Sequence, residues 1–369
     1  MDKKDVIQQQ AEDIWFKHRR GTLAIATGVG KTRIALNILH KLYREGLKVI
    51  LVVPTEKLRD KNWSEECNKW NFGYLYDILQ RECYVNIHKI KDQKYDLVIL
   101  DEAHCITELS NEFFRNNEIG DIVSLTATTP KDPIKAAIIE SIAPVIFKYT
   151  LEEGLKDGII TPFKINVVDL VLDDKDKYIK AGTKDKPFLQ TELDRYLYLN
   201  DKVSRSFYSN YKDAVKFAIL ERLRFIYNLK TKTEAAKFII QNLIPDDRVL
   251  IFAGSIIQAE MLCDKTFHSK SKDTDLTDFQ EGRINRLSCV NALNQGINIA
   301  ALDSAIITQV KSKDHHIIQQ IGRIVRWRED HVANIWVLRV LNTVDETWVN
   351  TALASFDKSL INYIYYKNM

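Results

Sequence analysis

The chain has few cysteines, and their spacing argues against a metal site. Its 369 residues include five cysteines, an odd number, and none of them stands in a Cys-x-x-Cys pair. No His-x-x-x-His spacing lies beside them, so we do not expect a zinc site. The pattern indicates reduced thiols in a cytosolic compartment.

Long apolar runs are also missing. No apolar stretch approaches the length of a membrane span, and no apolar run follows the charged amino terminus at residues 1–5. We therefore expect a cytoplasmic protein with no signal peptide and no membrane partner.

Charge of one sign is not in excess. The formal net charge is +3 at pH 7, and 45% hydrophobic with 28% charged residues is ordinary for a globular protein. A charge this small does not diagnose a polyanionic partner, so any nucleic-acid site requires a local concentration of basic residues. The length of 369 residues allows two or three domains.

Apolar runs alternate with helical patterns in two parts of the chain. Within residues 1–150 the runs lie at 22–26, 48–53, 97–100 and 121–125, with helical patterns such as 33–43 between them. From residue 246 the runs lie at 249–253, 305–308 and 335–340, and a closing helix is expected near 347–365. This alternation predicts an α/β fold whose parallel sheets are covered by helices on both faces.

The stretch between these parts has a different texture. Residues 145–165 are expected to form a crossing segment, and residues 170–245 are charged, Tyr-rich and mostly helical in period. We therefore predict three parts, namely an α/β domain at 1–150, a crossing segment with a helical region at 151–245, and a second α/β domain at 246–369.

A glycine-rich turn follows the first apolar run. Residues 24–32 read Ala-Ile-Ala-Thr-Gly-Val-Gly-Lys-Thr. Glycines let backbone N–H groups wrap around phosphate oxygens, Lys31 adds a charge for the β- and γ-phosphates, and the Thr32 hydroxyl can ligate Mg²⁺. A helix that opens at Lys31 also points the positive end of its dipole at the phosphates. The predicted nucleotide-binding residues are Thr27, Gly28, Val29, Gly30, Lys31 and Thr32.

Two adjacent carboxylates end the apolar run at residues 97–100. Asp101 is expected to hold Mg²⁺ together with Thr32, and Glu102 to orient and activate the attacking water. Each stretch has a plainer interpretation, a strand-to-helix turn and a strand exit, and Ile25 replaces the first glycine of the common Gly-x-x-x-x-Gly-Lys-Thr pattern. Their occurrence together, in this order and each after an apolar run, favours a site that binds and hydrolyses a nucleoside triphosphate.

Five further stretches complete a set of motifs. They read Val-Pro-Thr-Glu-Lys-Leu at 53–58, Leu-Thr-Ala-Thr at 125–128, Ile-Phe-Ala-Gly-Ser at 251–255, Asn-Ala-Leu-Asn-Gln-Gly-Ile-Asn-Ile at 291–299 and Gln-Gln-Ile-Gly-Arg-Ile-Val-Arg at 319–326. In the content and order of these motifs the chain resembles a superfamily-two helicase of the DEAH type over nearly its whole length. The stretches 27–32, 149–154 and 293–296 favour the branch that holds restriction-enzyme motor subunits, XPB-type DNA helicases and phage UvsW-type helicases.

The resemblance implies two RecA-like domains with parallel sheets, a helical segment between them, and ATP bound where the domains face each other. The second domain would bring Arg323 and Arg326 to the γ-phosphate, and their spacing of three places both on one face of a helix. A pair of surface arginines is the alternative, which the Gln-x-x-Gly-Arg-x-x-Arg context disfavours. Gly296 and Asn298 are also implied to lie at the nucleotide.

Coupling roles follow from the same resemblance. The residues that match His104 and Gln319 meet across the cleft in related helicases, and the Thr126 and Thr128 hydroxyls would link the ATP site to the domain contact. Gln8 stands where related enzymes carry an adenine-reading glutamine. Three consecutive glutamines leave the register open, and a solvated helix face is the alternative for this residue.

The nucleic-acid face that the resemblance implies consists mainly of small polar groups, which contact phosphate rather than bases. Its residues are Pro54, Thr55, Lys57, Ser255 and Asn294. The helical region 202–237 mixes Lys, Arg, Tyr and Phe, which is the composition of a strand-tracking surface. An amphipathic bundle with a solvated basic face is the alternative.

Two positions depart from the family pattern. Related enzymes usually carry Glu or Asp where this chain has Gln295, and Asp where it has Asn298. Both replacements remove a negative charge, while the expected Mg²⁺ ligands and the water-activating carboxylate lie elsewhere. Hydrolysis should therefore survive, whereas the coupling of hydrolysis to movement is put in doubt.

The sequence thus favours an ATP- and Mg²⁺-dependent helicase or translocase that acts on nucleic acid. Resemblance to this branch favours DNA over RNA and movement from 3′ to 5′, and an RNA helicase is one alternative. A second alternative is an ATP-switched nucleic-acid-binding subunit, which Glu102, Arg323 and Arg326 disfavour. The compact chain is typical of a phage or mobile-element enzyme, whose location would be the host cytoplasm.

Overall fold

The structure is a computed structural model that describes residues 2–56, 58–127, 130, 132–208, 213–271, 273–290, 302–310, 331–354 and 356–368. The described chain divides after Pro162 into two compact units. Each unit is built around its own parallel sheet, which confirms the predicted α/β fold class. The boundaries drawn at residues 150 and 245 stay a prediction.

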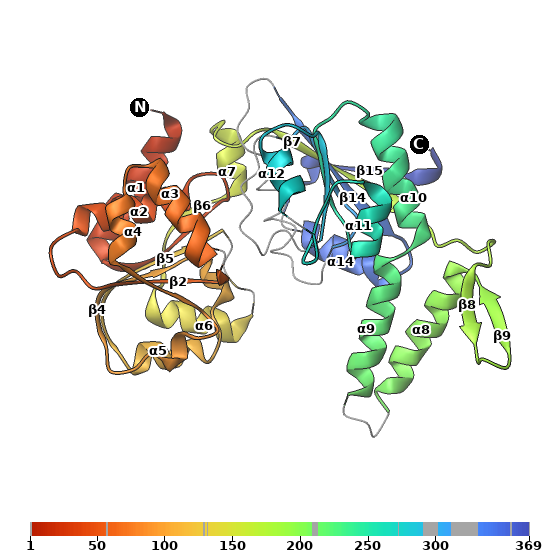
Figure 1. Cartoon of the computed structure of the whole chain (residues 1–369), viewed down its shortest axis with the longest axis horizontal. Helices are drawn as coiled ribbons and strands as arrows, with labels where there is room; N and C mark the ends of the chain where they lie inside the picture. The colour runs from red at the N-terminus through yellow and green to blue at the C-terminus, as the bar shows by residue number, and fades with distance from the viewer. Residues whose placement is uncertain are drawn as a thin grey trace. The chain divides into compact units, whose positions relative to one another are not determined.

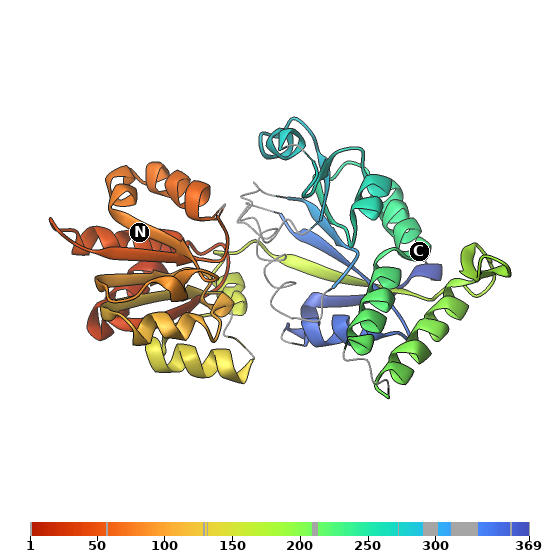
Figure 2. The same cartoon turned by 60° about the horizontal axis from the view of Figure 1, so that its bottom comes forward.

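The first unit contains a six-stranded sheet in the order β3-β2-β4-β5-β1-β6, and every neighbouring pair is parallel. Its strands are β1 (Arg20–Ile25), β2 (Val49–Val53), β3 (Leu79–Cys83), β4 (Lys94–Leu100), β5 (Glu118–Thr126) and β6 (Val145–Tyr149). Its helices are α1 (Lys3–His18), α2 (Lys31–Leu42), α3 (Trp63–Lys69), α4 (Gly73–Ile78), α5 (Ser110–Arg115), α6 (Pro133–Ile142) and α7 (Leu151–Lys156). Helices lie on both faces of this sheet (Figure 2).

The sequence pattern explains the core of the first unit. All five residues of β2 are buried, as expected for a central strand of a parallel sheet covered on both faces. Helix α2 buries one apolar face, which includes Ile34, Ile38 and Leu39. The indole Nε1 of Trp15 donates to the carbonyl of Ile122, so α1 is tied directly to the sheet.

The second unit contains a seven-stranded parallel sheet in the order β11-β12-β10-β13-β14-β7-β15. Its strands are β7 (Phe163–Leu170), β10 (Val249–Phe252), β11 (Thr266–Phe267), β12 (Arg286–Cys289), β13 (Ser304–Ile307), β14 (Ala333–Val340) and β15 (Ile361–Tyr365). Its helices α10 (Lys230–Phe238), α11 (Ile256–Leu262), α12 (Thr274–Gln280) and α14 (Val344–Leu353) accompany the sheet.

The chain passes from the first unit to the second after Pro162, within the stretch 145–165 that was expected to cross between domains. This stretch also contains β6 and the start of β7, two strands that the sequence analysis did not predict, and β7 pairs with β14 along its whole length. One local prediction is wrong. The closing helix expected near 347–365 ends at Leu353, and β15 follows it as an edge strand beside β7. The isoleucines and tyrosines of β15 suit a sheet, and the side of β7 that does not pair with β14 gives this strand a partner that local periodicity does not reveal.

The helical region that follows β7 in the chain forms an extension of the second unit. Helices α8 (Glu192–Ser206) and α9 (Ala214–Tyr227) pack side by side, and the antiparallel strands β8 (Ile179–Gly182) and β9 (Pro187–Gln190) lie next to α8 (Figure 1). The mostly helical character predicted for this stretch is confirmed, and the hairpin is an addition that the sequence did not reveal.

Candidate functional site

The glycine-rich turn lies between the end of β1 and the start of α2. Gly28 and Gly30 have φ of 95° and 100°, in the left-handed region that favours glycine. A Cβ on Gly30 would collide with the side-chain amide of Gln8. A Cβ on Gly28 would meet no atom of the described residues, so the turn presents an open backbone surface there. Both glycines therefore have a steric reason to be glycine.

The start of α2 can receive an anion. Gly30 is its N-cap, and no side chain caps the first N–H groups, so these donors remain available. Lys31 follows at once, and its Nζ lies 3.3 Å from the carbonyl oxygen of Ile25 at the end of β1. The ammonium is thus held beside the glycine turn, where a phosphate group would gain from both its charge and the helix dipole.

Helix α1 supports this turn from behind. The Gln8 side chain is 2% exposed, and its Nε2 donates to the carbonyl oxygen of Val29 at 2.7 Å. Burial shows that Gln8 does not lie on a solvated helix face. The contact fixes the backbone of the turn, whereas a contact of Gln8 with adenine stays a prediction.

Two residues of α1 that the sequence analysis missed, Asp5 and Glu12, form polar contacts with α2. Asp5 pairs with Arg33 at 2.8 Å, and Glu12 accepts from Asn37 at 2.7 Å and from Lys41 at 2.6 Å. Positions 5, 8 and 12 share one helix face, and positions 33, 37 and 41 do so on α2. This matched spacing of polar residues was the available signal.

Asp101 lies at the carboxyl end of β4 and is buried. Its Oδ2 accepts from the indole of Trp63 at 3.0 Å, and its Oδ1 accepts from the backbone N–H of Glu102 at 3.0 Å. Burial, together with the neighbouring charge of Glu102, raises the pKa of Asp101 to about 6. A cation at this carboxylate would favour the charged form, so Asp101 is suited to hold Mg²⁺.

Glu102 has a strained backbone and an unsatisfied side chain. Its φ is 48°, an uncommon value for a residue with a Cβ. Its Oε2 is buried and accepts no hydrogen bond from the residues that the structure describes, although His104 Nδ1 lies 3.5 Å away. A buried carboxylate oxygen without a donor is costly unless a ligand or water completes it.

His104 joins β4 to β5. Its Nδ1 lies 3.3 Å from the Thr126 hydroxyl at the end of β5, and burial lowers the pKa of the imidazole. The structure therefore brings together Asp101, Glu102, His104 and Thr126 at the carboxyl ends of neighbouring strands. Parallel strands end at the same sheet edge, which explains why residues far apart in sequence meet there.

Eight of the predicted site residues lie outside the described residues. They are Lys57, Thr128, Asn294, Gly296, Asn298, Gln319, Arg323 and Arg326. Their assigned roles stay predictions.

The described part of the predicted nucleic-acid face lies at strand ends in both units. Pro54 and Thr55 follow β2, and the Thr55 hydroxyl accepts from the backbone N–H of Leu58 at 3.4 Å. Ser255 caps the start of α11 by accepting from the N–H of Gln258 at 3.1 Å, and its hydroxyl also bonds Asn228. Both hydroxyls stabilise local turns, so any phosphate contact would be additional to a structural role.

The helical extension carries paired charges and exposed aromatic rings. Arg195 and Lys202 of α8 both pair with Glu221 of α9, at 2.8 and 2.7 Å. Phe207 and Tyr208, at the end of α8, are 65% and 91% exposed. A strand-tracking role for this surface stays a prediction. Separately, none of the described helices combines the length and the apolar character needed to cross a membrane.

Fold and site together define a class. A glycine turn followed by Lys and Thr at the end of β1, with an acidic pair at the end of β4 in the same parallel sheet, is the arrangement of a P-loop NTPase. A second parallel-sheet unit follows it in the chain, as in RecA-like motor proteins.

Comparison with known proteins identifies the family. Residues 2–131 match the family described as type III restriction enzyme, res subunit, and residues 231–328 match the helicase conserved C-terminal domain. The chain belongs to the superfamily-two helicases and is related to the restriction-enzyme and XPB branches. The family uses ATP with Mg²⁺.

Two curated relatives have similar sequences. The DNA 3′-5′ translocase XPB2 of Sulfurisphaera tokodaii is 24% identical over 368 residues, which cover 89% of this chain and 80% of that protein. The endonuclease subunit of type I restriction enzyme EcoAI of Escherichia coli is 24% identical over 290 residues, which cover 69% of this chain and 32% of that subunit.

Solved structures show the same fold. The ATP-dependent type ISP restriction-modification enzyme LlaBIII bound to DNA has a TM-score of 0.63 at 16% identity, covering 97% of this chain and 31% of that one. Dbp5 of S. cerevisiae bound to RNA has a TM-score of 0.63 at 13% identity, covering 98% and 90%. The Hef helicase domain of Pyrococcus furiosus has a TM-score of 0.51 at 14% identity, covering 95% and 98%. The chain thus spans about a third of the two restriction-enzyme chains.

Proposed function

We propose that this chain is an ATP-driven translocase or helicase that acts on DNA. The observation that carries the ATPase is the strand-end edge of the first unit. There an open glycine turn, the ammonium of Lys31 and a buried, unsatisfied oxygen of Glu102 occur together. Such an edge is suited to complete its polar interactions with a nucleotide and a water molecule.

The residues have distinct roles in this proposal. The turn from Thr27 to Gly30 and the ammonium of Lys31 bind the phosphates. Thr32 and Asp101 hold Mg²⁺, which when bound supplies positive charge against the phosphate oxygens. Glu102 orients the attacking water and accepts its proton, because no described residue donates a hydrogen bond to its Oε2.

Residues of the carboxyl-terminal half complete the site. Arg323 and Arg326 stabilise the charge that develops on the transferred phosphoryl group, and Gly296 and Asn298 contact the nucleotide. His104, Thr126, Thr128 and Gln319 couple the nucleotide state to movement. Pro54, Thr55, Lys57, Ser255 and Asn294 contact the strand backbone. Motif order and family membership support these roles.

DNA is the proposed substrate, with 3′ to 5′ movement. The named activity of the XPB2 relative and the DNA bound to the LlaBIII enzyme support it. Dbp5, which is bound to RNA, has the same fold, so the fold alone does not separate the two nucleic acids.

The test is ATP hydrolysis by the full chain with single-stranded DNA, duplex DNA, forked DNA and RNA of matched length. We expect low basal turnover that rises several-fold with DNA, and tracking-strand polarity follows from displacement of streptavidin from either end of a single strand. Affinity should fall steeply between 50 and 200 mM salt if phosphate contacts dominate. Stimulation by RNA alone would indicate an RNA helicase, and turnover indifferent to every nucleic acid would contradict a motor.

A further inference from the structure

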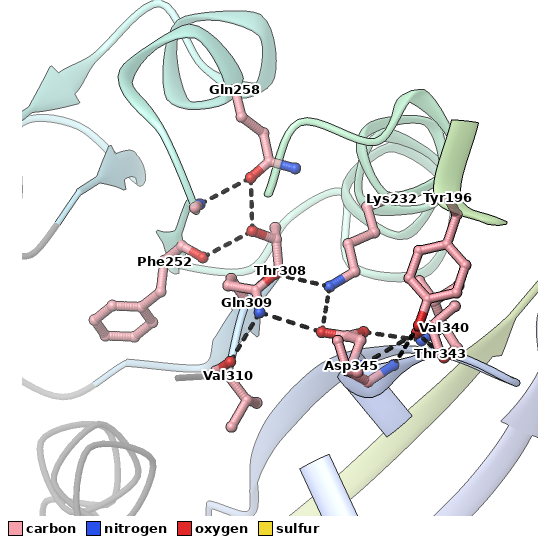
Figure 3. Close-up of polar contacts among 12 residues, drawn as sticks. Tyr196, Lys232, Phe252, Gln258, Thr308, Gln309, Val310, Val340, Thr343 and Asp345 are labelled. Carbon is pink, nitrogen blue, oxygen red and sulfur yellow. Dashed lines mark hydrogen bonds and ion pairs between the residues drawn. The ribbon is translucent and has the colours of Figure 1, made fainter. Parts of the chain in front are cut away.

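A buried polar cluster lies at the carboxyl ends of the second unit's strands (Figure 3). Lys232, from α10, and Asp345, from α14, are both 0% exposed, and Lys232 Nζ lies 2.9 Å from Asp345 Oδ1. A buried ion pair contributes little net stability, because removal of two charges from water offsets their attraction. Stability alone therefore does not explain why this ion pair occurs in a core otherwise rich in apolar residues.

Gln309, just after the end of β13, contacts both members of the ion pair. Its Oε1 accepts from Lys232 Nζ at 3.0 Å. Its Nε2 donates to Asp345 Oδ1 at 3.2 Å and to the carbonyl oxygen of Val310 at 2.8 Å. Both amide N–H groups and the amide oxygen are engaged, so the side chain has one orientation. A carboxylate at this position would lose both donors.

The cluster joins three parts of the second unit. Lys232 connects it to α10, and Gln309 connects it to the segment after β13. Asp345 connects it to the turn after β14, where its Oδ2 accepts from the N–H of Val340 at 2.9 Å and its own N–H donates to the Thr343 hydroxyl at 3.2 Å. The chain therefore leaves β13 in a direction set by polar contacts with defined geometry.

The neighbouring residue ties the same segment to α11. Thr308 Oγ1 lies 2.7 Å from Gln258 Oε1, which also accepts from the N–H of Gly254 at 2.8 Å. Gln258 is the residue whose N–H is capped by Ser255, a predicted contact to the nucleic-acid strand. The consecutive residues Thr308 and Gln309 thus connect the start of α11, where Ser255 lies, to the Lys232–Asp345 ion pair.

We propose that Lys232, Gln309 and Asp345 are positioning residues for ATP turnover. Val310, whose carbonyl Gln309 holds, directly precedes the sequence segment 311–330 that carries Arg323 and Arg326. The cluster fixes the backbone of Val310, and in this proposal it acts through the arginines that follow in the sequence rather than on the nucleotide. This inference rests on the proposed function, in which Arg326 stabilises the transferred phosphoryl group.

The test is Gln309→Met, which keeps the side-chain length and leaves the Lys232–Asp345 pair in place. We expect kcat of the DNA-stimulated ATPase to fall roughly tenfold to a hundredfold, as when a catalytic group is misplaced by a small distance. Nucleotide affinity should stay near wild type, because the phosphate turn lies in the other unit. Asn166→Leu is the matched control, since it removes a buried amide from β7, away from the end of β13. Equal loss of kcat in both variants would overturn the proposal.

A double-mutant cycle with Arg326→Ala separates the inference from the function on which it rests. If Gln309 acts through Arg326, the double variant is no slower than Arg326→Ala alone. Normal turnover in Arg326→Ala would contradict the proposed role of the arginine, and the inference would fall with it. Collapse in Arg326→Ala with normal turnover in Gln309→Met would overturn the inference alone. If Gln309→Met does not fold, Gln309→Glu takes its place, because it keeps the acceptor for Lys232 and loses both donors.

Discussion

The strand ends of the two sheets differ in how their polar groups are satisfied. Among the described residues of the first unit, a buried Glu102 oxygen has no hydrogen-bond donor, and a Cβ on Gly28 would meet no atom. In the second unit Lys232, Gln309 and Asp345 satisfy one another without leaving an oxygen or amide of Gln309 unused. The carboxyl-terminal edge of each sheet, where its strands end, is rich in polar groups. We call these the first edge and the second edge. In the described part of the first edge a buried polar group lacks a hydrogen-bond partner, whereas those of the cluster in the second edge are satisfied.

This difference separates two uses of buried polarity. A group left unsatisfied in a folded chain raises the free energy of that chain, and a ligand that completes it is bound more tightly. A cluster whose polar groups are all hydrogen-bonded has no donor or acceptor left for a ligand. Its contacts instead fix the positions of the surrounding segments. We therefore expect substitutions in the first edge to change nucleotide chemistry at nearly constant stability, and those in the second to change stability or geometry.

The largest effects should occur in the first edge. Glu102→Gln should lower kcat by about 10²–10⁴-fold, because it keeps the shape of the side chain but removes the basic oxygen. Its ATP affinity, measured with a fluorescent nucleotide, should remain near wild type. Near wild-type turnover in purified Glu102→Gln would contradict the assignment of Glu102 as the water-activating residue.

Lys31→Ala should instead lose most of the ATP affinity in the same fluorescent-nucleotide measurement, since it removes the cation of the turn.

A stability effect of intermediate size is expected in the second edge. Lys232→Met should lower the free energy of unfolding by about 3–5 kcal/mol, because it leaves the Asp345 carboxylate buried without its cation. The double variant Lys232→Met/Asp345→Leu should be less destabilised than Lys232→Met, although it carries one more substitution. Urea denaturation of both proteins measures this. A double variant that is less stable than the single one would mean that the pair itself stabilises the fold.

The smallest effect should follow from Gln8→Ala. Loss of its hydrogen bond to the Val29 carbonyl should cost about 1 kcal/mol in the phosphate turn and weaken nucleotide binding by about fivefold. Gln10→Ala is the matched control, because that side chain is exposed on the same helix. Isothermal titration with ATP and Mg²⁺ compares the two, and equal affinities would show that α1 does not support the turn.

Local sequence was sufficient to predict the main polar residues of the first edge. The glycine turn and the acidic pair consist of consecutive residues whose chemistry depends little on the rest of the chain, so their place at the ends of β1 and β4 was predictable. The alternation of apolar runs likewise predicted two parallel sheets. The strands missed include β7 and β15, which pair with each other at one side of the second sheet. Their pairing depends on partners distant in sequence, which periodicity does not reveal.

The sequence alone therefore determined the class of chemistry and the type of fold. Short motifs indicate the chemistry, and the spacing of apolar residues indicates the fold. Tertiary structure alone decided that Gln8 is buried against the phosphate turn. It also decided that Lys232 and Asp345, 113 positions apart, share one buried site with Gln309. Such contacts follow from how helices pack onto sheets, and no local pattern in a single sequence specifies which distant side chain will complete a buried charge.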